Sequence, residues 1–146
     1  MSAIKVMAMG RKITAIYAGL SKPICKKYGI NQSCFDVLMF CANNPDYNTA
    51  RDICSVRGIK SGIASVAVEN LIQAGLMVRI PDLSDRRIHR LVPTDKAKKI
   101  ILEGRKMQNK FIFSLKNGIT PEEEAVFERV NEKILENINR LSMEEV

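Results

Sequence analysis

The chain has 146 residues, which is enough for one domain with a single core. Hydrophobic residues make up 46% of it, aromatic residues only 5%, and tryptophan is absent, so the composition favours helices over a β-sandwich. The formal net charge of +7 suits a polyanionic partner, either nucleic acid or an acidic membrane surface, although a basic protein without such a partner would carry the same charge. No run of about 18 apolar residues occurs, so no membrane span is predicted.

The first predicted helix covers residues 4–20 and is amphipathic. Its apolar residues recur at steps of three and four: Val6, Met9, Ile13, Ile16, Tyr17 and Leu20. Pro23 stands where this helix would continue, so we expect a kink or a break there. Asn31 is placed to cap a second helix. The predicted buried stripe of that helix is Phe35, Leu38, Met39 and Ala42.

The central stretch, residues 48–94, predicts two helices joined by a tight turn. The first is TARDICSVRG, and Thr49 is placed to cap it. Its apolar residues stand three apart on one face: Ala50, Ile53 and Val56. The second is KSGIASVAVENLIQAGL, which Gly75 ends. Its buried stripe is expected to be Ile63, Ala67, Val68, Leu71 and Ile72. Two helices joined in this way are typical of a DNA-groove reader.

A basic hairpin follows the second of these helices. Residues 76–80 form a short apolar run that suits a strand, residues 81–87 form a polar turn, and residues 88–92 return as the partner strand. A basic hairpin beside a helix-turn-helix is a wing. The predicted fold class is therefore mainly α with a small β wing, a winged helix-turn-helix.

Residues 69–95, ENLIQAGLMVRIPDLSDRRIHRLVPTD, resemble the winged helix of the MarR-type transcription regulators. The residues that match in the same spacing are Leu71, Gly75-Leu76, Asp85-Arg86-Arg87 and Thr94, with weaker matches upstream at Gly29 and Phe35. Pro93 stands where that family usually has Leu. The recognition helix of the family usually carries an Arg beside a central Thr or Ser, whereas Val66 follows Ser65 here. Base reading by that arginine cannot be carried over, so we expect part of the selectivity to come from DNA shape.

Two further helices are predicted after the wing. Thr94 is placed to cap the first, and Asn117-Gly118 ends it. Its apolar residues are Ala97, Ile100, Ile101, Met107, Phe111 and Leu115. Thr120 and Pro121 begin the second. Its apolar residues are Val126, Val130, Ile134, Ile138 and Leu141. One-sided helices of this length at both ends of the chain exceed what a small winged helix can cover, so we expect a homodimer. Residues 31–93 would then be the DNA-binding part, and residues 1–30 and 94–146 the dimerisation part.

The turn of the wing is the sharpest functional signal. Arg86 or Arg87 would enter the minor groove or grip a phosphate, and the sequence leaves open which of them reaches the groove. Asp85 would pair with a neighbouring arginine and stiffen the tip. A charged, solvated hairpin without a DNA contact is the alternative.

The predicted recognition helix offers further DNA contacts. Lys60, Ser61 and Ser65 occupy its exposed half, although Ser61 would serve only as a cap if the helix began after it. Arginines outside this helix would hold phosphates or remain solvated: Arg51, Arg57 and Arg79.

Cysteine and histidine usage predicts no metal and no other cofactor. The cysteines form no CxxC pair and should be reduced in a cytosolic protein: Cys25, Cys34, Cys41 and Cys54. We expect them to serve as small apolar filler, with Cys25, beside Lys26 and Lys27, as the only candidate redox sensor. His89 is the only histidine, whereas most metal sites need several His or Cys ligands.

The sequence therefore predicts a transcription regulator rather than an enzyme, because no nucleophile-and-base set or phosphate-binding loop is visible. The specific prediction is a cytoplasmic, ligand-responsive repressor that binds palindromic double-stranded DNA as a homodimer, with no membrane partner. The alternatives are a thiol-based redox regulator and a winged-helix binding module without operator specificity. The resemblance implies an apolar or aromatic effector, bound in a cleft between the DNA-reading and dimer-forming parts. Its expected lining is Ile16, Tyr17, Leu38 and Met39.

Overall fold

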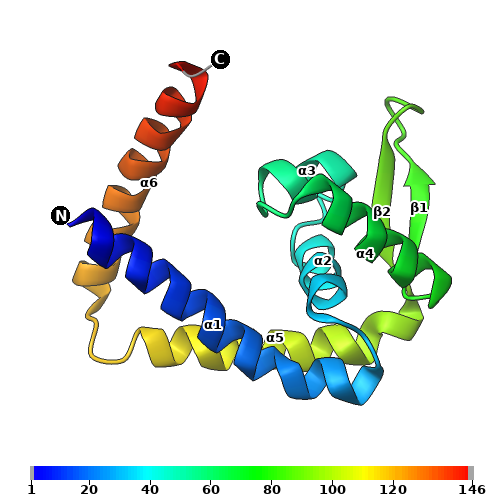
Figure 1. Ribbon diagram of the computed structural model, residues 1–146, viewed down its shortest axis with the longest axis horizontal. Coiled ribbons are helices and arrows are strands. Elements are labelled where there is room, and N and C mark those ends of the chain that lie inside the picture. The colour runs from blue at the N-terminus through cyan, green and yellow to red at the C-terminus, as the bar shows by residue number, and fades with distance from the viewer. Residues whose placement is uncertain (1, 145–146) are drawn as a thin grey trace. The chain divides into compact units, whose positions relative to one another are not determined.

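The computed structural model describes residues 2–144 (Figure 1). The chain divides into two compact units, Met1–Phe111 and Ile112–Val146, and each is described by itself. The elements in chain order are α1 (Ala3–Tyr28), α2 (Gln32–Asn43), α3 (Ala50–Ser55), α4 (Ser61–Gln73), β1 (Met77–Pro81), β2 (His89–Pro93), the 3-10 turn η1 (Asp95–Ala97), α5 (Lys98–Leu115) and α6 (Pro121–Glu144). The predicted fold class, a mainly α winged helix with two antiparallel strands, is confirmed. Among the described helices, none is long and apolar enough to cross a membrane.

Helix α1 passes through Pro23 as one continuous helix, so the break expected there is wrong. Proline removes only one amide donor from the helix ladder. The neighbouring residues Ser21, Ile24 and Cys25 are buried, and their packing holds this turn of the helix in place. The helix ends at Gly29, whose amide donates to the carbonyl of Cys25.

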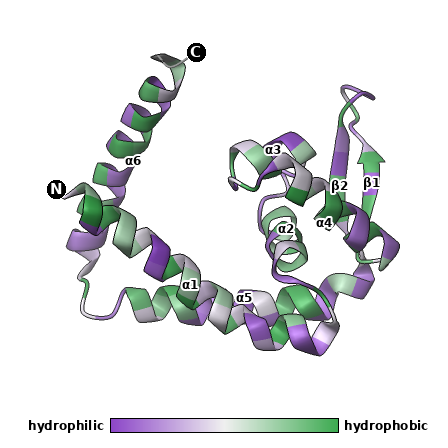
Figure 2. Ribbon diagram, in the orientation of Figure 1, coloured by the Kyte–Doolittle hydropathy of each residue, from purple (hydrophilic) through white to green (hydrophobic). Residues whose placement is uncertain are grey.

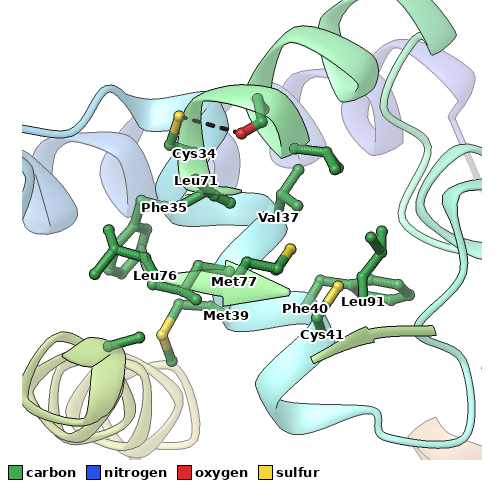
Figure 3. Packing of buried hydrophobic residues seen from close by; sticks show 14 of the residues in the cluster. Cys34, Phe35, Val37, Met39, Phe40, Cys41, Leu71, Leu76, Met77 and Leu91 are labelled. Carbon is green, nitrogen blue, oxygen red and sulfur yellow. Dashed lines mark hydrogen bonds between the residues drawn. The ribbon is translucent and has the colours of Figure 1, made fainter. Parts of the chain in front are cut away.

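Helix α2 forms the centre of the core. Asn31 caps it as predicted, because the asparagine side chain accepts a hydrogen bond from the Cys34 amide at 2.8 Å. Its buried residues are Cys34, Phe35, Val37, Leu38, Met39, Phe40 and Cys41. This set is wider than the predicted stripe, since α1, α3, α4 and β2 all pack against α2. Figure 3 shows side chains of α2 clustered with Leu71, Leu76, Met77 and Leu91, and the thiol of Cys34 donating to the Ala67 carbonyl.

Helix α3 begins with a reciprocal capping box, which confirms Thr49 as its cap. Thr49 Oγ1 accepts from the Asp52 amide at 3.1 Å, and the Asp52 carboxylate accepts from the Thr49 amide at 3.1 Å. The predicted apolar face is only partly right, because Ile53 is buried whereas Ala50 and Val56 are exposed. Steps of three residues place these two side chains about 60° to either side of Ile53, and a helix of six residues meets the core along a narrower edge.

The buried stripe of α4 differs from the prediction at its start. Ala64, Ala67, Val68 and Leu71 are buried, whereas Ile63 remains 48% exposed and Ile72 is half-buried. The helix is therefore rotated so that Ala64, not Ile63, meets the core. Gly75 follows its end with φ of 71°, a left-handed conformation that costs glycine little. The Gly75 and Leu76 amides donate back to Ile72 and Leu71, as in a Schellman end.

The wing strands β1 and β2 each begin one residue later than predicted. They pair antiparallel with Arg79 opposite Leu91. The Leu91 amide also donates to the Asn48 carbonyl at 2.8 Å, which ties the wing to the segment before α3.

Thr94 does not cap a helix, contrary to the prediction. It makes no side-chain cap hydrogen bond, and Thr94 Oγ1 instead donates to the Gly75 carbonyl at 2.6 Å. Lys96 Nζ donates to the Ala74 carbonyl at 2.7 Å. Both side chains therefore satisfy carbonyls at the C-terminal end of α4, while η1 delays the start of α5 to Lys98.

Gly104 allows α5 to lie directly on α2. A Cβ built on this residue would meet Met39 Sδ at 2.5 Å and the Phe35 ring at 3.3 Å. The predicted α5 stripe is partly buried: Ile100 and Phe111 are buried, Ile101 and Met107 half-buried, and Leu115 exposed.

The second unit contains α6, which Thr120 caps as predicted, and the cap is a reciprocal capping box with Glu123. Thr120 Oγ1 accepts from the Glu123 amide at 3.2 Å, and the Glu123 carboxylate accepts from the Thr120 amide at 2.9 Å. The predicted apolar stripe of α6 is exposed along the described chain, apart from the half-buried Ile134: Val126, Val130, Ile138 and Leu141.

The N-terminal half of α1 also carries an exposed apolar stripe. It comprises Val6, Met9, Ile13, Ile16 and Leu20. Figure 2 shows the alternation of hydrophobic and hydrophilic residues along both α1 and α6. Among the described residues, neither stripe is covered within its own unit.

Candidate nucleic-acid interface

A cleft of about 790 Å³ lies between α3, α4 and the wing. Ser61 and Ser65 line it from α4, and Arg51 lines it from α3. Arg79 and Arg87 line it from the wing. The fold therefore brings hydroxyl groups and guanidinium groups from separate parts of the sequence to one concave surface.

The start of α4 is open to solvent. Lys60, Ser61 and Ser65 are all exposed. Lys60 occupies the N-cap position and no side chain of the described residues caps the helix, so the alternative that Ser61 serves as the cap is wrong. The amides of the first turn thus lack a side-chain acceptor, which leaves them available to an anion.

The three arginines considered as phosphate contacts have different surroundings. Arg79 pairs with Glu69 of α4, so part of its charge is neutralised at the edge of the cleft. Arg57, in the turn between α3 and α4, approaches Asp36 of α2 at 3.6 Å. Arg51 lines the cleft directly. Of the three, Arg57 is the one that does not line the cleft.

Asp82 lies at the centre of the hydrogen-bond network of the wing. Its carboxylate accepts hydrogen bonds from the amides of Ser84 at 3.0 Å and Asp85 at 3.1 Å. Arg90 Nε lies 2.9 Å from the same carboxylate, and Arg90 Nη1 reaches the Asp46 carbonyl and Asn48 Oδ1 at 3.3 Å. This network fixes the turn to the strand and the strand to the segment before α3.

The tip of the wing carries two arginines with different partners. Arg87 Nε lies 3.2 Å from Asp85 Oδ1, and the Arg87 amide donates to the same oxygen at 3.0 Å. Asp85 thus pairs with a neighbouring arginine in the structure. Arg86 makes no hydrogen bond or ion pair with any residue in the described range 2–144. Among the described residues, the tip therefore presents one arginine that a carboxylate holds and one that has no partner.

Both carboxylates of the wing stay ionised at neutral pH. The hydrogen bond from Arg90 holds the pKa of Asp82 below its ordinary value, with help from the two backbone amides. The hydrogen bond from Arg87 lowers the pKa of Asp85 in the same way. The network that shapes the tip is therefore complete at neutral pH.

Sequence reasoning missed Asp82 and Arg90. They are eight residues apart, on opposite sides of the turn. The available signal was the pair Asp82 and Ser84, since an aspartate that accepts from an amide two residues on is a common turn former. The partner on β2 follows only from the strand register, which places Ile80 opposite Arg90.

The residues expected to line an effector cleft do not come together. Tyr17 and Met39 line a cavity of about 180 Å³ with Asp36, Arg57 and Gln108. Leu38 is fully buried in the core and Ile16 is 53% exposed. Gln108 Nε2 donates to the Tyr17 hydroxyl at 2.7 Å. Burial raises the pKa of Asp36.

The cysteines are all free thiols, and three of them are buried. Burial raises the pKa of the Cys25 thiol, with a smaller contribution from the charge of Asp36. A redox sensor needs a lowered pKa, so this environment disfavours Cys25 as a sensor. Within residues 2–144 no three His, Cys, Asp or Glu side chains form a metal-binding group.

Residues 28–88 match the model of the MarR family. They run from the end of α1 through α4 and β1 to the end of the wing turn. Over this segment, which is less than half of the chain, the sequence is similar to the MarR family. No curated protein matches the sequence. The suspected resemblance to the MarR regulators is thus confirmed on the segment that contains the helix-turn-helix.

Solved structures share this MarR-type fold. Transcriptional regulator PA3341 aligns with a TM-score of 0.80 at 23% identity, over 94% of this chain and 97% of its own. CouR from Rhodococcus jostii RHA1, bound to p-coumaroyl-CoA, gives 0.68 at 16% identity over 88% of each chain. The S. aureus MepR–DNA complex gives 0.57 at 18% identity, over 88% of this chain and 96% of that protein. At these sequence identities, the similarity to the solved structures shows a shared fold and nothing more.

Proposed function

We propose that this protein is a transcription regulator that binds double-stranded DNA as a homodimer and represses until an effector binds. The observation that carries the proposal is the cleft between α4 and the braced wing, with Arg86 at the tip unpaired among the described residues. Such an arrangement suits a helix in the major groove and a wing in the adjacent minor groove. The similar MepR structure contains DNA, which supports the same use of this fold here.

Helix α4 is proposed to read the major groove with its N-terminal half. The uncapped amides and Lys60 hold a phosphate, while Ser61 and Ser65 face base edges. Val66 is 60% exposed where the MarR resemblance leads one to expect an arginine. Its methyl groups suit the methyl group of thymine, an apolar contact that discriminates less than a bidentate arginine does. We therefore propose a modest specificity ratio.

Arg86 is proposed to enter the minor groove, and Arg87 to stay on the phosphates. Asp85 holds Arg87 at 3.2 Å, so moving Arg87 into the groove would break an existing pair. Arg86 has no such pair to lose within the described chain. The network of Asp82 and Arg90 fixes the turn, which reduces the entropy lost when the tip docks.

Dimerisation through α1 and α6 is proposed on the basis of their uncovered apolar stripes. A twofold dimer places two α4 helices on one face of the duplex, about one helical turn apart. The operator would then be an inverted repeat.

A small effector is proposed to bind at the cavity beside Tyr17 and Met39. The similar CouR structure holds p-coumaroyl-CoA, which supports control by a small molecule. The cavity, at about 180 Å³, is smaller than most ligand pockets, so the effector is small or widens the cavity on binding. The redox alternative requires a reactive Cys25, which the raised pKa of this buried thiol disfavours.

The test is selection of bound genomic fragments followed by footprinting at two salt concentrations. We expect a palindrome, and an affinity that falls steeply with salt because phosphate contacts dominate. Arg86→Ala should weaken DNA binding by roughly 1–3 kcal/mol, and Arg87→Ala should weaken it by less. Lys133→Ala on α6 removes the same charge and is the control, so it should bind DNA as wild type does. Ser65→Ala should relax the preference among operator variants more than it lowers affinity. If no palindrome emerges and both wing variants bind DNA as wild type does, the proposal of a regulator fails. The alternative, a binding module without operator specificity, then takes its place.

A further inference from the structure

The first two turns of α4 expose an apolar surface to solvent. Ile63 is 48% exposed and Val66 is 60% exposed. They stand three residues apart, so they are neighbours on one side of the helix. Gly62, which is also exposed, lies one turn before Val66 and adds no side chain. This surface, formed by Gly62, Ile63 and Val66, is here called the apolar face of α4.

Few side chains in this part of α4 can form a hydrogen bond with a base. In residues 61–68 only Ser61 and Ser65 carry a hydrogen-bonding group in the side chain. A hydroxyl group both donates and accepts, so it distinguishes the bases weakly. The next such residue is Glu69, which is paired with Arg79 of the wing. Where α4 reads bases, its apolar contacts therefore carry most of the discrimination.

Gly62 leaves room beside the apolar face. A Cβ built on this residue meets no atom of the described chain within 4 Å, so close packing does not require a glycine. Helix propensity does not favour it either, because glycine destabilises a helix relative to alanine. A backbone without a side chain lets another molecule approach the helix closely. The surface next to Val66 is therefore accessible to a bulky partner.

The groups around the apolar face favour an anionic partner. Lys60 precedes α4, and the amides of the first turn have no side-chain acceptor among the described residues. Arg51 and Arg87 line the cleft beside Ser61 and Ser65. A protein with a purely apolar surface would cover the apolar face and leave these cations without counter-charges. The major groove of DNA offers phosphates at its edges and the C5-methyl group of thymine on its floor, so it matches both features.

We propose that the apolar face of α4 reads the C5-methyl groups of pyrimidines in the major groove. The inference rests on the DNA-binding function proposed above, and it names the chemical group that is read. Thymine and 5-methylcytosine carry this methyl group, whereas uracil and unmethylated cytosine lack it. The protein therefore binds more tightly when the base that contacts Val66 is methylated at C5. Methylation of a cytosine at this position would strengthen binding.

The first test changes only the methyl group of the DNA. Each thymine of the operator recovered by genomic selection is replaced in turn by uracil, which keeps the hydrogen-bonding groups of the base pair. At the contacted thymine, uracil should weaken binding by the full chain about fourfold, the effect of one methyl group that is no longer buried. Replacing the symmetry-related thymine as well should weaken binding about sixteenfold, since separate contacts add in free energy. A 5-methylcytosine–guanine pair at this position should bind about fourfold more tightly than a cytosine–guanine pair.

The second test assigns the methyl contact to α4. Its readout is the ratio of the affinities for the thymine and uracil operators, in which a general change of DNA affinity or of dimerisation cancels. Ile63→Ala/Val66→Ala should bring this ratio close to one, and both positions are exposed helix positions that accept alanine. Ile119→Ala, at an isoleucine that is also 48% exposed but lies between α5 and α6, is the control and should keep the wild-type ratio. Val66→Arg should replace the methyl preference by a preference for guanine, whose O6 and N7 accept from arginine.

Three results would overturn the inference and leave the DNA-binding function in place. A uracil scan without an effect at any thymine would show that no methyl group is read. An affinity ratio that Ile63→Ala/Val66→Ala leaves unchanged would place the methyl contact on another element. Operator binding that leaves the amide chemical shifts of residues 61–67 unchanged would show that the apolar face stays outside the groove and serves a protein partner instead. If the protein shows no sequence-selective DNA binding at all, the proposed function fails and this inference fails with it.

Discussion

Helices α2 and α6 both carry apolar residues at helical spacing, but only one of them is covered. Seven of the 12 residues of α2 are buried, because α1, α3, α4 and β2 pack around it. In α6, 24 residues long, none of those whose exposure is described is buried. The periodicity predicts that a face will be covered and does not say whether the cover comes from the same chain.

Helix α1 combines both situations in one element. Its C-terminal part buries Ser21, Ile24 and Cys25 against the core, and the rings of Tyr17 and Phe111 meet at 5.9 Å. Its N-terminal part leaves Ile4 and Met7 at 77% and 66% exposure. The uncovered stripes thus begin where the chain's own core ends, which is why we propose that a second copy covers them.

The largest expected effect comes from placing charges on the stripe of α6. Val130→Glu/Ile134→Glu should produce monomers, because a dimer would bury four unpaired carboxylates, each at a cost of several kcal/mol. The dimer dissociation constant should rise more than about a thousandfold. The wing and the core, which lie in the other unit, should keep their wild-type amide shifts. A double variant that sediments as a dimer would contradict the proposed covering of α6.

The next effect compares matched truncations on the two helices. Leu38→Ala, at a position with 0% exposure, should lower the free energy of unfolding by about 2–5 kcal/mol at every protein concentration. Val130→Ala should lower the free energy of unfolding by less. The decrease should depend on protein concentration, since the side chain of Val130 stabilises the protein through association. Chemical unfolding at two protein concentrations measures both. A Val130→Ala cost independent of concentration would show that the face of α6 is covered within the chain.

Sequence patterns predicted the positions of the helices and strands well. They predicted less well which face of each helix turns toward the core. The caps at Asn31, Thr49 and Thr120 were predictable because a capping hydrogen bond is local, spanning three residues. Ile63 and Val56 were misplaced because adjacent apolar residues leave the rotation of a helix open until its neighbours are known. Thr94 was misassigned since its hydroxyl bonds a carbonyl 19 residues away. The wing arginines were visible in sequence, whereas the pairing that distinguishes Arg86 from Arg87 needed coordinates.

A smaller effect tests the close approach of α5 to α2. Gly104→Val should lower the free energy of unfolding by roughly 1–3 kcal/mol, because its branched Cβ would displace Met39 and press on Phe35. Gly104→Ala should cost less, since the better helix propensity of alanine, about 1 kcal/mol, offsets part of the clash. Thermal unfolding of both variants gives the comparison. A Gly104→Val protein as stable as wild type would show that Met39 can move aside without loss.

Thiol labelling is the test that perturbs the protein least. It compares the burial of side chains on α2 with the burial of side chains on α6. In the native chain Cys54 should react first, because Cys25, Cys34 and Cys41 are buried. Burial raises the pKa of Cys41 to about 12, so its thiolate fraction at neutral pH is about a thousandfold below that of an ordinary thiol. Cys41 should therefore react only when α2 opens.

A fifth thiol extends this measurement to α6. Val130→Cys places it on the apolar stripe, and Glu132→Cys places it on the exposed polar face of the same helix as the control. If a second copy covers the stripe, the thiol of Val130→Cys should react roughly tenfold more slowly than the control at high protein concentration. On dilution below the dimer dissociation constant the two rates should converge, because 45% of Val130 is exposed in the single chain. Equal rates at every concentration would mean that nothing covers α6, and its apolar face would then differ from that of α2 in function as well as in burial.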